Sequence, residues 1–438
     1  MVRRGRLTIS IFELTALLLT LAAIFGWLNI RFIHMSQAVA LLIMGLVVSL
    51  LLVGIETALP GQGFAKRLSN GLSKINFTQV VMNGMLAFLL FAAALDVNLR
   101  ALRDRAWQVG FLAFLGTTAS TFLVGLAFWF ASRWLAYEIP LAWAFVMGAV
   151  ISPTDPVAVI SALKNVDMPK NIDVEMQGEG LFNDGVAIVL FVVLVGFATQ
   201  TKETTVAEVL ITFLREVGGG LAIGVVTGFI AYWALRPIDE FTIEILVTLA
   251  LVTATYAIAQ RLGASGPLSV VAAGLIVGSR GRRYAMSDES EQYLSAVWTL
   301  IDQILNAVLF MLIGLEVLVL RDANYSIPLA LITIPIVLLA RLVALSIPVL
   351  VFRSARTLAI RNVPFLTWAG IRGGVSVALA LALPNGGAKY EILAATYAVV
   401  LFSIIIQSST LGRVARITIG RGKSPEGQEE RDPSEPEA

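Results

Sequence analysis

The sequence Ile151-Ser-Pro-Thr-Asp-Pro156 interrupts an apolar block that extends from residue 140 to residue 163. Its two prolines remove backbone donors and push the residues before them out of helical geometry. A helix broken inside an apolar block leaves free carbonyls beside the hydroxyl of Thr154 and the carboxylate of Asp155. Such oxygens are ligands for a small alkali cation. The alternative is a proline-kinked helix in which Asp155 caps the second half, and capping and ion binding are compatible.

The chain around this stretch has the composition of a membrane protein. Hydrophobic residues make up 57% of its 438 residues and charged residues only 14%, whereas a water-soluble domain carries about a quarter charged residues. The apolar blocks approach or exceed the roughly 20 residues with which a helix crosses a bilayer. We therefore predict an all-α polytopic membrane protein with about thirteen transmembrane helices, at 8–30, 36–59, 76–96, 107–132, 140–163, 174–199, 206–235, 241–260, 265–279, 292–320, 326–352, 362–384 and 389–412.

A second interruption, Ala369-Gly-Ile-Arg-Gly-Gly374, lies inside the apolar block 362–384. Two interrupted spans, each with a charged residue at its break, indicate a transporter built from inverted repeats, with two broken helices that cross at the site. Arg372 has two interpretations. It either neutralises the carboxyl ends of the broken helices or takes a direct part in handling the ion.

The block after the first break begins with Gly178-Glu-Gly-Leu-Phe-Asn-Asp-Gly185. On a helix, Glu179 and Asn183 share a face, and Asp184 projects from a neighbouring one. The alternative is that these acids lie in the solvated first turns of the helix, where they are favourable. Arg341 stands in the middle of a long apolar run and needs a buried partner. Glu179 is the first choice for that partner and Asp184 the second.

Further along the chain, Asn306 in Leu305-Asn-Ala-Val-Leu-Phe-Met-Leu-Ile-Gly-Leu-Glu316 is expected to make an interhelical hydrogen bond. The stretch from Asn306 to Glu316 belongs to an ordered set of motifs. The other members are Thr154-Asp155-Pro156, Glu179 through Asp184, Ala340-Arg341-Leu342 and Gly370 through Gly374. In this set of motifs the sequence resembles the monovalent cation:proton antiporters, specifically the sodium/proton exchanger branch regarded as electroneutral.

The resemblance implies roles for these residues. Asp184 would carry the cation or the proton in competition, while the site alternates between the two membrane faces. Thr154 and Asp155 would complete the monovalent metal site, and Asn183 would orient them. Glu179 and Arg341 would form a structural ion pair. Electrogenic relatives place a second Asp at the position of Asn183, so one proton for one cation is the expected exchange.

Two positions depart from the family pattern. Family members often carry Ser at the position of Gly180, and many bacterial relatives carry an acid where this chain reads Phe91-Ala-Ala-Ala94. A ligand is therefore missing at Gly180 and another at Ala92. The cation stays open among sodium, lithium and potassium.

Two rival functions are an intramembrane aspartyl hydrolase, with Asp155 and Asp184 as its dyad, and a cation channel. We expect a transporter rather than an enzyme, with no cofactor, no nucleic-acid partner and, by family analogy, a homodimer. Residues 1–419 are expected to form the transmembrane domain, with its ion-binding helices around 140–199 and 326–384. The polar tail 420–438 is expected to be disordered.

The Lys- and Arg-rich connections predict a cytoplasmic C-terminus. The sequence shows no organelle-targeting pattern, so we expect a multi-pass protein of the bacterial inner membrane. With thirteen spans the richest of these connections fall on one side of the membrane. The basic residues before the first block, with Lys66, Arg67 and Lys74, predict the opposite orientation for the N-terminal part.

Overall fold

The computed structural model describes residues 11–58, 84–97, 106–163, 170–199, 206–281, 287–320, 325–351, 362–384, 386 and 388–418. Regular structure within these ranges is helical, and no strand occurs in them. Nine of the described segments are long and apolar enough to cross a membrane as helices. A helix satisfies its own backbone groups where no water is available. The predicted all-α polytopic fold is confirmed.

The predicted count of thirteen transmembrane helices is not confirmed. Besides the nine long segments, the described residues contain three shorter apolar helices, at Leu86–Asp96, Leu141–Ile151 and Gly266–Ser279. The predicted block 362–384 contains two short helices, and the first half of the predicted block 76–96 lies largely outside the described residues. Each predicted block contains described helix, but length and composition alone do not show how many blocks cross the membrane.

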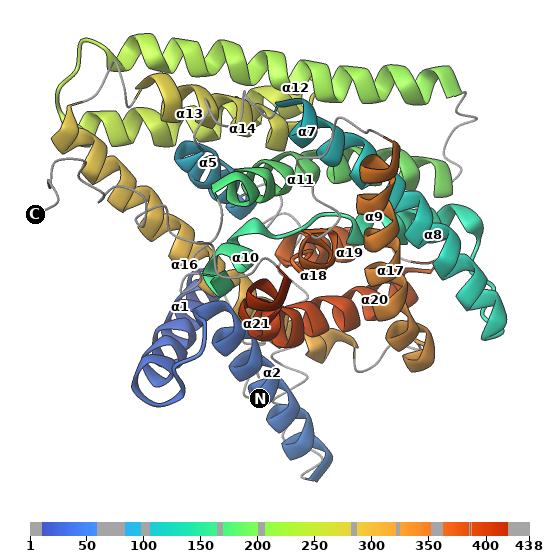
Figure 1. Cartoon of the computed structure of the whole chain (residues 1–438). Helices are drawn as coiled ribbons and strands as arrows, with labels where there is room; N and C mark the ends of the chain where they lie inside the picture. The colour runs from blue at the N-terminus through green and yellow to red at the C-terminus, as the bar shows by residue number, and fades with distance from the viewer. Residues whose placement is uncertain are drawn as a thin grey trace, which may run out of the picture.

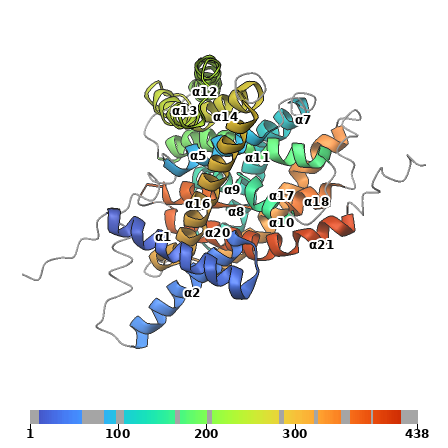
Figure 2. The ribbon, with the colours of Figure 1, turned by 90° about the vertical axis from the view of Figure 1, so that its left-hand side faces the viewer.

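Two groups of helices lie on opposite sides of the molecule (Figures 1 and 2). The first group consists of α5 (Leu86–Asp96), α12 (Val206–Leu235), α13 (Phe241–Arg261) and α14 (Gly266–Ile276). The second group consists of α1 (Ile11–Leu28) and α2 (Gln37–Ala58). The long helix α16 (Asp288–Leu320) joins the two groups, because it packs against α5 and α13 and also along α2.

The central helices lie between these groups (Figure 1). They are α8 (Thr117–Trp134), α9 (Leu141–Ile151), α10 (Pro156–Leu163), α11 (Lys170–Ala198), α17 (Ile327–Val351), α18 (Val363–Trp368), α19 (Gly374–Leu381), α20 (Lys389–Phe402) and α21 (Ser408–Thr418). A short helix α7 (Ala106–Phe111) and a π-helical turn η3 (Leu112–Gly116) precede α8. Three further π-helical turns are η1 (Asn29–Ile33), η4 (Val277–Gly281) and η6 (Ser403–Gln407). Among these helices, α9 and α20 contribute the most buried apolar side chains to the core.

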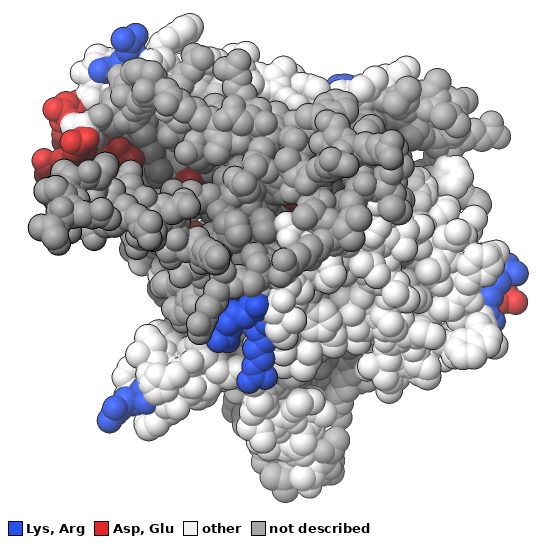
Figure 3. All heavy atoms as spheres, viewed as in Figure 1, with Lys and Arg blue, Asp and Glu red and all other residues white. Residues whose placement is uncertain are grey.

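The outer surface suits lipid. Large apolar side chains such as Leu50, Phe130, Trp233 and Leu339 are exposed on the long helices. Figure 3 shows most described atoms of one face as uncharged, with charged side chains gathered in a few clusters. An apolar surface of this extent is stable in a membrane and not in water.

The first broken helix follows the sequence closely. Helix α9 ends at Ile151, residues 152–155 are not helical, and α10 begins at Pro156. Proline is favourable at the first position of a helix, because no backbone donor is needed there. The predicted interruption at 151–156 is confirmed.

The second broken helix meets the first one at the break. Helix α18 ends at Trp368 and α19 begins at Gly374. The backbone N–H of Asp155 donates to the carbonyl of Ile371 at 2.8 Å, so the two non-helical stretches touch. The two broken helices therefore cross at their interruptions, as predicted from the paired breaks. The inverted-repeat relation between the halves stays a prediction.

Candidate functional site

The candidate site lies where α11 passes the first break. Asp184 and Asn183 follow Glu179 by about one turn, and all three side chains are buried. Because α11 begins at Lys170, these residues lie beyond its first turns, and a solvated helix start does not describe them. Asn183 Nδ2 donates to Thr154 Oγ1 at 2.6 Å. That hydrogen bond joins α11 to the break.

Asp184 presents a buried oxygen to which no described residue donates a hydrogen bond. Among the described residues, Oδ1 of Asp184 and Oδ1 of Asn183 are buried and accept no hydrogen bond. A buried oxygen of this kind is uncommon in proteins and calls for a partner. Asp155 and Arg372 lie within electrostatic range of Asp184. When ionised, the two carboxylates and the guanidinium leave one negative charge, which one proton or one monovalent cation neutralises.

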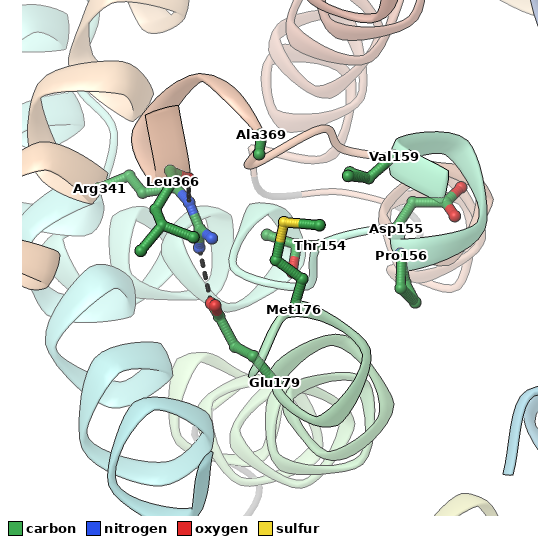
Figure 4. A pocket seen from close by; sticks show the side chains of 9 residues that line it. All are labelled: Thr154, Asp155, Pro156, Val159, Met176, Glu179, Arg341, Leu366 and Ala369. Carbon is green, nitrogen blue, oxygen red and sulfur yellow. Dashed lines mark hydrogen bonds and ion pairs between the residues drawn. The ribbon is translucent and has the colours of Figure 1, made fainter. Parts of the chain in front are cut away.

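Asp155 caps α10, as one of the two interpretations of the sequence predicted, while its role in ion binding stays a prediction. Its Oδ1 accepts a hydrogen bond from the Ala158 N–H at 3.0 Å, which caps α10. Its Oδ2 lies against Gly373, where a side chain would collide with the carboxylate. In Figure 4 the carboxylate lies on the side of the break away from Glu179 and Arg341. One oxygen of Asp155 thus serves the cap, while the other faces the second break.

Arg341 and Glu179 lie in contact. Arg341 Nη1 donates to Glu179 Oε1 at 2.9 Å, and Arg341 Nε donates to the carbonyl of Leu366 at 3.2 Å. The buried partner is therefore Glu179 and not Asp184. Because Leu366 belongs to α18, this one guanidinium connects α11 with the helix before the second break.

A small cavity lies beside the ion pair (Figure 4), lined by Thr154, Asp155, Pro156, Val159, Met176, Glu179, Arg341, Leu366 and Ala369. Asp184 is not among its lining residues. The structure thus brings Thr154 and Asp155 to the cavity wall. The Asn183 amide, which donates a hydrogen bond to Thr154, belongs to α11. The oxygens that could hold a small monovalent cation are those of Thr154, Asp155 and Asp184.

Arg372 contacts the carboxyl end of α9. The residue is 0% exposed, and its Nη1 donates to the carbonyls of Ser152 and Pro153. Two of the carbonyls that the broken helix was expected to free therefore already have a donor. Nε and Nη2 of Arg372 make no hydrogen bond to the described residues. These contacts match the charge-compensating interpretation of Arg372, and its field reaches Asp184 as well.

At Gly180 and Ala92, the two positions that depart from the family pattern, apolar groups of other residues pack closely. A Cβ atom added to Gly180 would lie 2.7 Å from Cγ of Pro156, so the proline ring occupies the place of a side chain. Ala92 is buried in an apolar cluster with Phe91 and Trp298.

Two contacts of the site residues and their neighbours were not predicted from the sequence. Asn306 Nδ2 donates to Asp302 Oδ1 of its own helix at 3.0 Å, and the interhelical hydrogen bond predicted for Asn306 stays a prediction. Sequence reasoning also missed the close approach of Gly373 to Asp155. The adjacent glycines at 373 and 374 were the available signal.

The fold and the site together define a class of protein. Interrupted helices that meet inside an all-α membrane protein, beside buried carboxylates, are the architecture of secondary transporters. The family described as "Sodium/hydrogen exchanger, transmembrane" matches residues 18–417, and the chain belongs to this family.

Relatives and a solved structure agree with this assignment. The Na(+)/H(+) antiporter NhaP of Pseudomonas aeruginosa is 39% identical over 410 residues, covering 92% of this chain and 96% of that protein. The Na(+)/H(+) antiporter NhaH of Halobacillus dabanensis is 32% identical over 380 residues, covering 86% of this chain and 90% of that protein. The structure of the sodium proton antiporter MjNhaP1 from Methanocaldococcus jannaschii has a TM-score of 0.75 at 20% identity, covering 93% of this chain and 98% of that chain. This structural likeness concerns the fold alone.

Proposed function

We propose that this protein is a secondary active transporter that exchanges a monovalent cation for protons across the membrane. Family membership over residues 18–417 and relatives named as Na(+)/H(+) antiporters support the exchange. Sodium is the first candidate, and lithium and potassium are the alternatives. The observation that carries the proposal is the buried Oδ1 of Asp184, which accepts no hydrogen bond among the described residues.

The exchange proceeds by competition at Asp184. Its carboxylate binds either a proton or a dehydrated cation, and the site alternates between the two membrane faces. The Thr154 hydroxyl oxygen accepts a hydrogen bond from Asn183 and keeps a second lone pair for a cation. Asp155 adds a carboxylate oxygen from the break. Because Asp155, Asp184 and Arg372 together hold one surplus negative charge when ionised, occupancy by one cation or one proton leaves this group of three neutral.

The same charge balance supports an electroneutral exchange of one proton for one cation. Asn183 occupies the position at which electrogenic relatives carry a second Asp. Glu179 and Arg341 neutralise each other 2.9 Å apart and serve as a structural pair. Arg372 compensates the carbonyl dipoles at the end of α9.

The protein is multi-pass, and we assign it to the bacterial cell membrane, where it acts as a homodimer with its C-terminus in the cytoplasm. Residues 1–419 form its transmembrane domain. The proposed tail, residues 420–438, lies outside the described residues, as do most of the basic connections on which the orientation rests.

The test uses purified protein in liposomes with an imposed pH gradient and a lumenal pH dye. Pulses of sodium, lithium or potassium are added with and without a clamp on the membrane potential. Asp184→Asn is compared with Asp288→Asn, a matched change at an exposed residue. We expect cation-triggered collapse of the gradient that the clamp leaves unchanged, normal in Asp288→Asn and absent in Asp184→Asn.

Other outcomes separate the rivals. Collapse that requires the clamp would contradict electroneutrality. Cation flux without any counter-ion would indicate a channel. Exchange retained in Asp184→Asn would refute competition at this carboxylate.

A further inference from the structure

The carboxyl end of α18 is capped from two other helices. A helix leaves its last four carbonyls without helical donors. At α18 the carbonyls of Phe365 and Thr367 accept backbone N–H groups of the following turn, at 2.8 and 3.2 Å. The other two accept side-chain donors. Leu366 receives Arg341, and Trp368 receives Gln407 Nε2 at 3.0 Å.

Gln407 is held in one orientation for this contact. It is 1% exposed and is the last residue of the π-helical turn η6, directly before α21. Its Oε1 accepts a hydrogen bond from Ser403 Oγ at 2.5 Å, which leaves Nε2 directed to Trp368. Single π-turns inside helices are frequent at functional positions.

A second hydrogen bond fixes the side chain of Trp368. Its Nε1 donates to Thr410 Oγ1 at 2.9 Å, and its ring contacts Phe402 edge-to-face at a centroid distance of 6.2 Å. Gln407 and Thr410 are three residues apart and share a helix face. Both the backbone carbonyl and the indole of Trp368 are therefore bound by one face of the last described helical segment.

The same segment contacts the first broken helix. Leu411 and Ala415 of α21 are buried in one apolar cluster with Ala158 and Val159 of α10 and with Phe365 of α18. Helix α21 thus packs on the half-helix that follows the first break and on the half-helix that precedes the second break.

Ile371 and Arg372, which contact the first break, lie three and four positions after Trp368. Ile371 accepts the Asp155 N–H, and Arg372 binds the carbonyls at the end of α9. Any displacement of the end of α18 would move these two residues and, through them, Asp155 and Thr154.

We infer that Gln407, together with Thr410, is a positioning residue for the transport site. It fixes the end of α18 and thereby the distance between the second break and the carboxylate of Asp155. It touches neither cation nor proton. This inference rests on the proposed cation/proton exchange.

The test compares Gln407→Leu and Thr410→Val with two matched controls, Gln303→Leu on α16 and Thr253→Val on α13, whose residues are exposed. The cation concentration for half-maximal exchange and the maximal rate are measured in liposomes, together with the thermal unfolding temperature of each purified protein. Losing a donor to a buried carbonyl should raise the half-maximal concentration about tenfold in Gln407→Leu. Thr410→Val should show a smaller rise, and both controls should match the wild type.

A role in stability alone would lower the yield and the unfolding temperature but leave the half-maximal concentration of the surviving protein unchanged. That result in both variants would overturn the inference. Gln407→Met keeps the length of the side chain and removes the donor without adding a charge, so it takes the place of Gln407→Leu and should show the same rise if Gln407→Leu folds poorly. A wild type without cation-driven proton movement would instead refute the proposed function.

Discussion

Gly180 determines how closely α11 approaches the first break. A Cβ atom at this position would lie 2.7 to 2.9 Å from three carbons of the Pro156 ring, so glycine is required by the close packing. In this chain the Pro156 ring occupies the place that a side chain at position 180 would take. Under the proposed function, Thr154, Asp155 and Asp184 therefore supply the side-chain oxygens for the cation without a contribution from position 180.

We predict that Gly180→Ser does not restore a ligand but lowers stability. The new side chain forces α11 away from Pro156, and overpacking of this kind costs about 1–3 kcal/mol. Gly196→Ser is the control, because it lies on the same helix with nothing within 4 Å of an added Cβ. Thermal unfolding of the purified variants measures the difference. Equal unfolding temperatures with improved cation affinity in Gly180→Ser would contradict this account of the packing.

At the scale of elements, each of the two half-helices before a break ends on charged or amide donors from another element. The end of α9 receives Arg372 from the second break, and the end of α18 receives Arg341 and Gln407. Helix carboxyl ends carry partial negative charge, which cationic donors stabilise. At the crossing, carbonyl groups that lack a donor within their own helix therefore accept hydrogen bonds from neighbouring elements.

The contact between the breaks also depends on Gly373. An added Cβ would lie 2.8 Å from Cβ and Cγ of Asp155 and still closer to its Oδ2. We predict that Gly373→Ala displaces this carboxylate and reduces exchange by at least about tenfold, equivalent to roughly 1.4 kcal/mol of binding or barrier energy. Gly116→Ala, at a position with open space, should retain wild-type exchange. Both are measured as cation-driven pH change in liposomes, and full activity in Gly373→Ala would argue against the crossing geometry.

The elements differ in how far the sequence predicts them. Pro153 and Pro156 act through local backbone geometry, so the first break was predictable to within a residue or two. The pairing of Arg341 with Glu179 followed from the cost of an unpaired buried charge. The contact of Gln407 with Trp368 was not predictable, because it joins residues 39 positions apart through tertiary packing that no local pattern encodes. The predicted number of spans stays unconfirmed, because the length and composition of short and broken helices do not show whether they cross the membrane.

At the scale of the whole molecule, the helices around the crossing lie between two outer groups that α16 connects (Figure 2). Exposed apolar side chains on the long helices place these groups against lipid. The proposed orientation puts the start of α9 outside and the end of α21 in the cytoplasm.

This orientation can be tested with single cysteines, because the chain contains none. We predict that a membrane-impermeant maleimide labels Glu138→Cys in spheroplasts, where the outer face of the inner membrane is accessible. Arg416→Cys should react only after the cells are opened. Both residues are exposed in the structure. The reverse pattern would invert the proposed topology without affecting the exchange chemistry.

The central claim is that a cation and a proton compete for Asp184. The most direct measurement adds sodium, lithium or potassium to purified protein in weakly buffered solution and records the protons released for each cation bound. We predict the release of about one proton for each cation bound, because a cation and a proton cannot occupy the same carboxylate together. Release should be normal in Asp288→Asn and absent in Asp184→Asn. Cation binding without proton release in the wild-type protein, or release that survives Asp184→Asn, would contradict this claim.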